Sequence, residues 1–406
     1  MTLKYSLIPS NWDVLKEELA EPFENYENVQ NYLEIASGKF NLELKGLNIL
    51  NHSEMLPIFN FIRIQSLRLE EVFPEGKISI LQQNFNMTLS LTREQILILL
   101  CHMALLSFKP TSRHFYWVNF ENWLTDGRPC AMAYLEGLFS YFSITRNRLN
   151  TSWKTEMVNF TRKTYRNDIL PLPDVSLNTV NLHLSGKIGD FSPNLIDFAN
   201  EHIGFGISGT QEEVLFGSFI ELCPAMIFCC DAMKDNEAII IENAIKYASY
   251  EGYGFNLKYC SDGFDVQSHK SFNIIAIDAL DFSGDYATSL QLQLNPSNLE
   301  RELRKLIVGF SSINNDSIDT GHWGCGAFGG NKYLKVLLQM IAASVTGNKL
   351  SFCCFGDEQF YYSYKLFLSN CKFSANELWN KLLSLDPKIT YFTFNDIIST
   401  LEAKTK

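Results

Sequence analysis

Side chains suited to catalysis and ligand binding are concentrated in residues 197–213, which read Asp-Phe-Ala-Asn-Glu-His-Ile-Gly-Phe-Gly-Ile-Ser-Gly-Thr-Gln-Glu-Glu. Gly204, Gly206 and Gly209 carry no Cβ, so the backbone there can adopt positive φ and approach a ligand closely. A helix is expected to begin at Gln211, and the N–H groups at a helix start bind anions. This stretch therefore predicts a loop that binds a phosphate.

Three carboxylates of this stretch could face one cleft, namely Asp197, Glu212 and Glu213. Like charges held close together raise the pKa of one carboxyl group, which can then stay protonated near neutral pH and act as a general acid. A structural alternative exists, because Thr210 to Glu213 also has the spacing of a capping box. In that case Glu213 accepts a hydrogen bond from the Thr210 N–H and takes no part in chemistry. The residues alone leave both interpretations open.

A second glycine cluster, 321–330, reads Gly-His-Trp-Gly-Cys-Gly-Ala-Phe-Gly-Gly and precedes a predicted helix, 333–345. A glycine loop that leads into a helix start is a second candidate phosphate site. It lacks the Lys-Ser/Thr pair of a P-loop and the spacing of a dinucleotide fingerprint, and a tight structural turn is the alternative. Two such loops, one of them beside carboxylates, favour a nucleotide diphosphate as the ligand.

Aromatic residues could hold the base of such a ligand. Tyr247, Tyr250 and Tyr253 form one series, and Phe355 follows a predicted strand. Ligands of α/β proteins lie beyond the carboxyl ends of strands, and aromatic rings can stack on a base, although single tyrosines more often serve packing. The residues alone are compatible with either stacking on a base or packing in the core.

The composition indicates a well-packed globular protein, with 46% hydrophobic residues and a net charge of −11. The acidic balance and the lack of basic runs argue against a broad nucleic-acid interface. Ten cysteines are scattered without C-x-x-C pairs, which predicts no metal site and favours a reducing intracellular compartment. No signal-peptide pattern is seen at the start of the chain, and the longest apolar run, 96–106, is too short to cross a bilayer. We expect a soluble protein.

The hydrophobic pattern changes near residue 165. Residues 1–165 predict a mostly helical accessory region, whereas residues 166–406 alternate short apolar runs with helical stretches, as in an α/β domain with helices on both faces of its sheet. The predicted helices are 12–19, 26–35, 96–108, 129–142, 212–219, 299–309, 333–345 and 375–383. The predicted strands are 182–184, 195–198, 225–230, 239–241, 272–277 and 350–355.

Several motifs follow one another in an order that is specific. They are Asp197-Phe-Ala-Asn200, Gln211-Glu-Glu213, Tyr250-x-Gly-Tyr253, Ala276-Ile-Asp-Ala-Leu280 and Gly321-x-Trp-Gly-Cys-Gly-Ala-Phe-Gly-Gly330. In this order the chain resembles the poly(ADP-ribose) glycohydrolase family over about residues 90–390. The resemblance implies a macrodomain-like α/β core with a mixed sheet, preceded by the helical region. It also implies hydrolysis of the ribose–ribose O-glycosidic bonds of poly(ADP-ribose), with no metal and no cofactor.

By position, the resemblance implies a role for each candidate residue. Glu213 would be the catalytic acid that protonates the leaving ribose oxygen and then, as a carboxylate, activates water. Glu212 would hold the ribose hydroxyls, with support from Asp197 and Asn200. The other implied substrate-binding residues are Gln211; Gly204, Gly206, Gly324, Gly326, Ala327 and Phe328 around the diphosphate; and Tyr253 and Phe355 beside the adenine.

The chain departs from the family pattern at three places. Phe205 interrupts a glycine triplet, residues 207–210 make a shorter connection than usual, and His322 stands where the family carries asparagine. A bulky side chain at position 205 is expected to obstruct the diphosphate. Retention of both glutamates favours an active glycohydrolase, whereas the altered loop favours a pseudoenzyme that binds ADP-ribose or its polymer. A related ADP-ribosyl hydrolase with another linkage preference is a third hypothesis.

The resemblance also implies partners and a setting. The expected partners are poly(ADP-ribose) and poly(ADP-ribosyl)ated proteins, without sequence-specific nucleic-acid binding and without a membrane. We expect a monomer in the nucleus, the cytoplasm or both, with a part in the DNA damage response.

Overall fold

The computed structural model describes residues 3–48, 52–260, 270–284, 289–386, 388–389 and 391–397. The chain divides into two compact units, each assembled from three stretches of the sequence. The first unit comprises Met1–Thr161, His202–Ala232 and Ile241–Phe272, and the second comprises Arg162–Glu201, Met233–Ile240 and Asn273–Lys406. The expected domain boundary near residue 165 stays a prediction.

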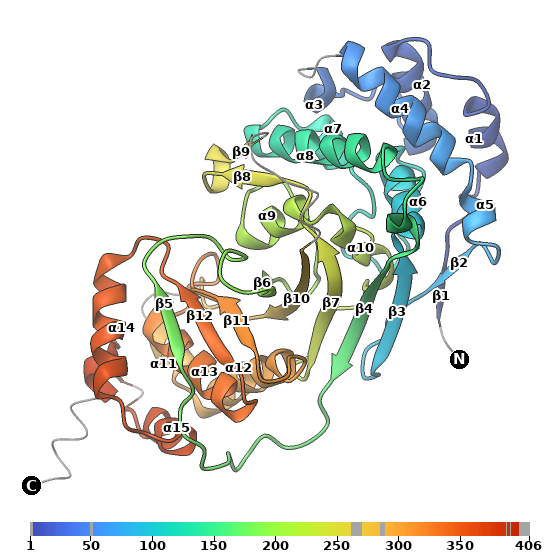
Figure 1. Ribbon diagram of the computed structural model, residues 1–406. Helices are drawn as coiled ribbons and strands as arrows, with labels where there is room; N and C mark the ends of the chain where they lie inside the picture. Colours follow the sequence, from blue (N-terminus) through green and yellow to red (C-terminus); the bar gives the residue numbers. More distant parts are fainter. Residues whose placement is uncertain are drawn as a thin grey trace, which may run out of the picture. The chain divides into compact units, whose positions relative to one another are not determined.

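The first unit is mostly helical, and α4 packs against both α6 and α8 (Figure 1). Its helices are α1 (Trp12–Glu18), α2 (Tyr26–Ser37), α3 (Lys45–Asn48), α4 (His52–Ser66), α5 (Leu69–Val72), α6 (Arg93–Ala104), α7 (Glu121–Thr125), α8 (Pro129–Arg146), α9 (Gln211–Ser218) and α10 (Ala225–Phe228). Its strands are β1 (Lys4–Ser6) and β2 (Lys77–Ser79), which pair antiparallel, β3 (Met87–Thr92), and β8 (Ser249–Glu251) and β9 (Lys258–Cys260), which also pair antiparallel.

Local signals explain where two of these helices begin. At α6, the Thr92 hydroxyl accepts from the Gln95 N–H at 3.1 Å, and the Gln95 side chain accepts from the Thr92 N–H at 2.9 Å. This reciprocal pair is a capping box, which satisfies two N–H groups that a helix start leaves unpaired. At α8, Pro129 occupies the first turn, where its missing N–H costs nothing. Helices α6 and α8 therefore begin close to where the sequence predicts them.

The predicted strand 225–230 is wrong, because Ala225–Phe228 form the short helix α10. Pro224 precedes this helix, and the Cys229 N–H closes it by donating to the Ala225 carbonyl at 2.7 Å. Every residue from 225 to 230 is buried. A short run that is apolar on all sides has no period, so its pattern cannot distinguish a buried strand from a buried helix.

Five parallel strands form the centre of the second unit, in the order β10-β6-β11-β12-β5. They are β5 (Val180–His183), β6 (Asn194–Ala199), β10 (Ser271–Asp278), β11 (Ser317–Thr320) and β12 (Lys349–Cys353). Continuous apolar runs such as residues 274–277 are typical of strands buried on both faces. Two further strands, β4 (Met157–Thr164) and β7 (Glu237–Ile245), have residues in both units, as β10 does at its first two residues. The carboxyl ends of the five parallel strands meet at one edge, where α/β proteins bind ligands.

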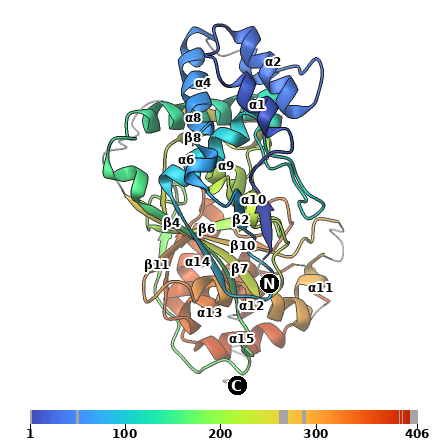
Figure 2. The same ribbon diagram turned by 90° about the vertical axis from the view of Figure 1, so that its right-hand side faces the viewer.

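Helices of the second unit cover this sheet and share one hydrophobic core with it. They are α11 (Ser289–Gln293), α12 (Pro296–Phe310), α13 (Lys332–Val345), α14 (Glu358–Asn370) and α15 (Ala375–Leu383). Figure 2 shows α12, α13 and α15 gathered along the same side of the strands. Helix α12 packs tightly on the sheet at Gly309, where an added Cβ would lie 2.9 Å from the Cγ2 atoms of Ile275 and Ile277. Parallel strands covered by helices confirm the expected α/β class.

In the described part of the chain, no helix is both long enough and apolar enough to span a bilayer.

Gly309→Ala is expected to lower the free energy of unfolding. The added methyl group would press on Ile275 and Ile277, and overpacking costs about 1–3 kcal/mol. That cost outweighs the roughly 1 kcal/mol gained from the higher helix propensity of alanine. Urea unfolding measures the difference, with Gly284→Ala as the control because a Cβ there meets nothing within 4 Å. A Gly309→Ala variant as stable as the wild type would contradict this packing.

Candidate active site

Helix α9 begins at Gln211, as predicted, and Thr210 is its N-cap residue. The Thr210 N–H donates to Glu213 Oε2 at 2.9 Å, and the Glu213 N–H donates to the Thr210 hydroxyl at 3.5 Å. The capping box that the sequence offered as a structural alternative is therefore present. The capping box uses Oε2 of Glu213. A chemical role for Oε1 is therefore compatible with the capping box.

Both glutamates at the start of α9 turn back toward the glycine loop. The Gly204 N–H donates to Glu212 Oε1 at 3.0 Å, and Glu213 Oε1 lies so close to Gly206 that an added Cβ would overlap it. Of the three loop glycines only Gly209 has a positive φ, at +77°. The freedom to adopt positive φ is therefore used at Gly209 and not at Gly204 or Gly206. Gly206 is needed because the Glu213 carboxyl group fills the space where a side chain would be.

The Phe205 ring packs against aromatic residues of its own unit. Its centroid lies 5.0 Å from that of Phe120 and 4.6 Å from that of Trp123. The Trp123 indole N–H also donates to the Gly206 carbonyl at 2.7 Å. Trp123 therefore holds two consecutive residues of the shortened loop. This packing argues against the expected obstruction of a diphosphate by Phe205, because the ring already has aromatic neighbours in the fold.

Tyr253 lies near this loop because the backbones of Gly209 and Gly254 are in contact. The Gly254 N–H donates to the Gly209 carbonyl at 3.1 Å, and a Cβ on Gly209 would lie 2.6 Å from the Gly254 carbonyl oxygen. The Tyr253 side chain itself is 64% exposed. Its ring is thus accessible for stacking on a base.

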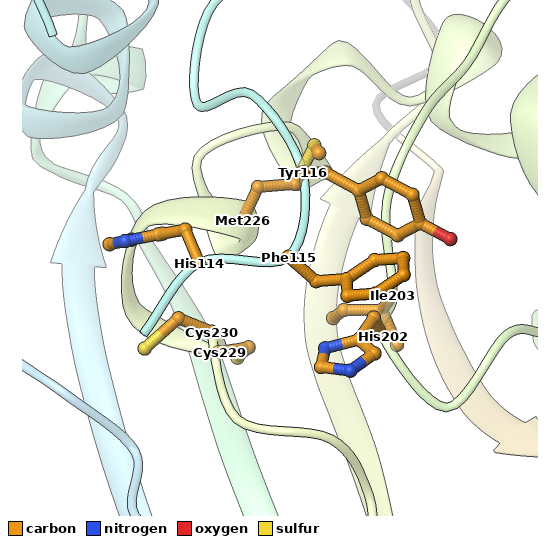
Figure 3. Close-up of a pocket in the computed structure, with 8 residues that line it drawn as sticks. All are labelled: His114, Phe115, Tyr116, His202, Ile203, Met226, Cys229 and Cys230. Carbon is orange, nitrogen blue, oxygen red and sulfur yellow. The ribbon is translucent and has the colours of Figure 1, made fainter. Parts of the chain in front are cut away.

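A small pocket adjoins the residues that precede the loop (Figure 3). It is lined by His114, Phe115, Tyr116, His202, Ile203, Met226, Cys229 and Cys230. The rings of Phe115 and His202 are stacked, with centroids 4.6 Å apart and planes 13° apart. The volume that the centre of a water molecule can occupy in this pocket is about 10 Å³, which is room for about one water molecule. The pocket is therefore too small for a nucleotide, and its stacked rings fix His202 two residues before Gly204.

In the second unit, Asp197 lies on β6 with its side chain 1% exposed. Among the described residues, neither of its carboxylate oxygens has a hydrogen-bond partner. Burial disfavours the charged form and raises the pKa of Asp197 to about 8. The carboxyl group is therefore mostly protonated at neutral pH and can donate a hydrogen bond as well as accept one.

The second glycine cluster, 321–330, connects β11 to α13 and is held by hydrogen bonds within the second unit. The Trp323 indole N–H donates to the Ile277 carbonyl at 2.9 Å, and the Gly330 N–H donates to the Gly324 carbonyl at 2.9 Å. Trp323 is fully buried. These bonds close the loop on itself and attach it to β10, as the structural-turn interpretation predicts.

The start of α13 is already capped by the protein. The Asn331 side-chain oxygen accepts from the Tyr333 and Leu334 N–H groups, both at 3.0 Å. An anion at this loop would therefore have to use N–H groups of the loop itself. Gly326 and Ala327 are exposed at its tip, so this part of the loop is accessible to a ligand.

Phe355 lies against the start of the same loop. A Cβ on Gly321 would be 2.5 Å from Phe355 Cε2, so the glycine makes room for the ring. Phe355 has a φ of +50° and is 48% exposed. The His322 ring lies 6.0 Å from the Phe355 ring, centroid to centroid. Burial lowers the pKa of His322 to about 4, so its imidazole is neutral at physiological pH.

The predicted site residues thus fall into two groups. The first unit brings together Gly204, Gly206, Gln211, Glu212, Glu213 and Tyr253. The second unit holds Asp197 on β6, Asn200 directly after it, the loop residues Gly324, Gly326, Ala327 and Phe328, and Phe355 after β12. Within the described ranges, no group of three or more His, Cys, Asp or Glu side chains could hold a metal ion.

Two residues important to this geometry were not identified from the sequence. Trp123 carries no local signal, because it contacts a loop about 80 residues further along the chain. Ser208 donates to Glu213 from within the loop. Its position, five residues before the glutamate, was the only signal that could have identified it.

Two family models match the chain. One is described as poly(ADP-ribose) glycohydrolase, Macro domain fold, and matches residues 172–362. The other is described as poly(ADP-ribose) glycohydrolase, helical domain, and matches residues 54–162. Together they span most of the chain and confirm the expected macrodomain fold with a helical region before it.

Named relatives share part of this sequence. Poly(ADP-ribose) glycohydrolase 1 of Caenorhabditis elegans is 38% identical over 198 residues, which cover 44% of this chain and 25% of that protein. Poly(ADP-ribose) glycohydrolase 2 of the same organism is 37% identical over 185 residues, covering 40% of this chain and 37% of that protein. The chain thus spans well under half the length of these two relatives. The solved structure of poly(ADP-ribose) glycohydrolase from Deinococcus radiodurans in complex with ADP-ribose has a TM-score of 0.30 and 16% identity, over 48% of this chain and 85% of that chain.

Phe205→Ala is expected to destabilise the first unit. The substitution removes two ring contacts, each worth about 0.5–1.5 kcal/mol, so the free energy of unfolding should fall by about 1–3 kcal/mol. Urea unfolding measures this change, and Phe255→Ala is the control because Phe255 is 65% exposed. If instead Phe205→Gly bound ADP-ribose more tightly than the wild type, the ring would be an obstruction after all.

Asp197→Asn is expected to flatten the dependence of stability on pH. The folded-state pKa of about 8 exceeds the unfolded value of about 3.9, so between these values only the folded chain keeps the proton. The contribution of Asp197 to stability is therefore complete below about pH 4 and falls, by up to roughly 1.4 kcal/mol per unit, as the pH rises to about 8. Urea unfolding of both proteins across this range isolates the effect, and parallel profiles would show that Asp197 is charged in the folded state.

Proposed function

Because this chain belongs to the poly(ADP-ribose) glycohydrolase family, we propose that it hydrolyses the ribose–ribose O-glycosidic bonds of poly(ADP-ribose) and releases ADP-ribose. The observation that carries the proposal is the position of Glu212 and Glu213 in the first turn of α9, directly behind a glycine loop that both side chains face. A carboxyl group fixed beside a loop that can receive a phosphate is suited to acid catalysis on a nucleotide sugar.

Glu213 is the proposed general acid and base. Its carboxyl proton passes to the leaving ribose oxygen as the C–O bond breaks, and the electrons of that bond stay with the oxygen. The resulting carboxylate then takes a proton from the water that adds to the oxocarbenium ion, which restores the acid. One residue thus serves both steps, unlike the scheme in which a second carboxylate is the nucleophile or base.

Ribose recognition is assigned to Glu212, Asp197 and Asn200. Glu212 accepts from the ribose hydroxyls, and its bond from the Gly204 N–H at 3.0 Å supports this assignment by fixing one carboxylate oxygen. Asp197 and Asn200 assist with the same sugar. A protonated Asp197 can donate to a hydroxyl oxygen, a contact that a carboxylate cannot make.

The diphosphate and adenine are assigned to the glycine loops and the exposed aromatic residues. The backbone at Gly204 and Gly206 lies around the phosphates, and N–H groups of Gly206 and of the exposed tip around Gly326 bind them, a role that needs no lysine. Tyr253 and Phe355 flank the adenine, and their exposures of 64% and 48% support a stacking role. Gln211, Gly324, Ala327 and Phe328 complete the proposed substrate-binding set.

We propose that the chain acts as a monomer on poly(ADP-ribose) and poly(ADP-ribosyl)ated proteins, in the nucleus, the cytoplasm or both, as part of the DNA damage response. The net charge of −11 supports recognition by local N–H groups and aromatic rings, because a broad field of that sign repels polyanions.

Glu213→Gln is expected to abolish most turnover while keeping the fold. Glutamine can fill the same capping position, as Gln95 does at α6, but it cannot give up a proton. The rate of ADP-ribose release from poly(ADP-ribose) should fall by about 10²–10⁴-fold, with the affinity for ADP-ribose nearly unchanged.

Glu377→Gln is the matched control, because Glu377 holds the same position in the capping box of α15. It should leave turnover unchanged. If Glu213→Gln lost activity only in proportion to lost folded protein, Glu213 would have a structural role alone. A wild-type chain that binds ADP-ribose but releases none from the polymer would be a binding module.

A further inference from the structure

Four donors converge on one oxygen of the Glu213 side chain. Glu213 Oε2 accepts from the Thr210 N–H at 2.9 Å and from the Thr210 hydroxyl at 3.0 Å. It also accepts from the Ser208 N–H at 3.2 Å and from the Ser208 hydroxyl. Thr210 belongs to the capping box, whereas Ser208 lies outside it. The two bonds from Ser208 are therefore additional to the capping box.

Two other capping boxes, both among the described residues, provide the comparison. At α6, Gln95 Oε1 accepts from the Thr92 N–H at 2.9 Å, and at α15, Glu377 Oε2 accepts from the Ser374 N–H at 2.8 Å. As far as the structure describes the chain, these two side chains accept from their N-cap residue only. Capping therefore does not require the additional donors seen at α9.

The second carboxylate oxygen of Glu213 has a different environment. Oε1 lies where a Cβ of residue 206 would be, so it faces the backbone of the glycine loop. A proton on Oε2 would point at donors and would displace one of them, whereas Oε1 can carry a proton without breaking any of these four bonds. The loop thus surrounds Oε2 with hydrogen-bond donors and places Oε1 against the backbone of Gly206.

The short connection between the glycine loop and α9 makes this arrangement possible. Only residues 207–210 separate Gly206 from Gln211, and Ser208 is five residues from Glu213. Its N–H and hydroxyl reach the same carboxylate oxygen because the chain turns within these few residues. The tight turn within residues 207–210 is thus what brings Ser208 to the acid.

We infer that Ser208 is a positioning residue for the general acid. Its two bonds hold Glu213 Oε2 in place, so that Oε1 carries the proton and presents it at the glycine loop. The inference rests on the proposed function, since it assigns a use to the acid named there. Without the hydroxyl, the carboxyl group can rotate and bring the proton to the wrong side.

The experiment compares Ser208→Ala, Ser208→Thr and Ser374→Ala with the wild-type full chain. It measures kcat and KM for release of ADP-ribose from poly(ADP-ribose), the Kd for ADP-ribose, and the midpoint of thermal unfolding. Ser208→Ala should lower kcat by about 10- to 100-fold, because a small misplacement of a catalytic group costs this much. Its KM and Kd should stay within about threefold of the wild type, since substrate contacts are kept.

Ser208→Thr retains the hydroxyl and should restore most of kcat. Ser374→Ala, which removes the hydroxyl of a capping box far along the chain, should leave kcat unchanged and so controls for a general loss of stability. The inference is overturned if Ser208→Ala keeps the wild-type kcat, if KM and Kd rise while kcat stays constant, or if Ser208→Thr is as slow as the alanine variant. A wild-type chain that binds ADP-ribose without releasing any would refute the proposed function itself, and the inference with it.

Discussion

The hydrogen bonds that the short loop makes to Glu213 are the constraint on which the rest of the candidate site depends. They join the glycine loop, the N-terminus of α9 and the acidic side chain into one hydrogen-bonded turn. Glu212 extends this turn through the Gly204 N–H. Phe205 and Trp123 then anchor the loop to the helical part of the same unit. The geometry of the candidate site and the local fold are therefore maintained by the same bonds.

The sequence predicted those features of the site that arise from neighbouring residues. The capping box at Thr210 and the start of α9 follow from side chains that are three residues apart. Strands such as 195–198 and 272–277 were recognised from continuous apolar runs, and they form the parallel centre of the second unit. Family motifs in a specific order then identified the macrodomain fold, which the family models confirm.

Features that depend on distant residues or on burial could not be predicted in the same way. The packing of Phe205 involves Trp123, which no local pattern connects to the loop. The protonated state of Asp197 depends on its complete burial, which the sequence does not specify. The run 225–230 predicts a strand but contains the helix Ala225–Phe228, because an apolar run buried on all sides carries no periodicity. In all three cases the outcome depends on tertiary contacts, which local sequence patterns do not report.

The overlap between residue 206 and the Glu213 carboxyl group couples the two positions. A side chain at 206, even a methyl group, would force the carboxyl group to rotate out of its place while leaving it chemically intact. Under the role proposed for Glu213, turnover would then be lost by steric displacement of the carboxyl group, with its proton still available. Such a variant would separate the effect of having the carboxyl group from the effect of its orientation.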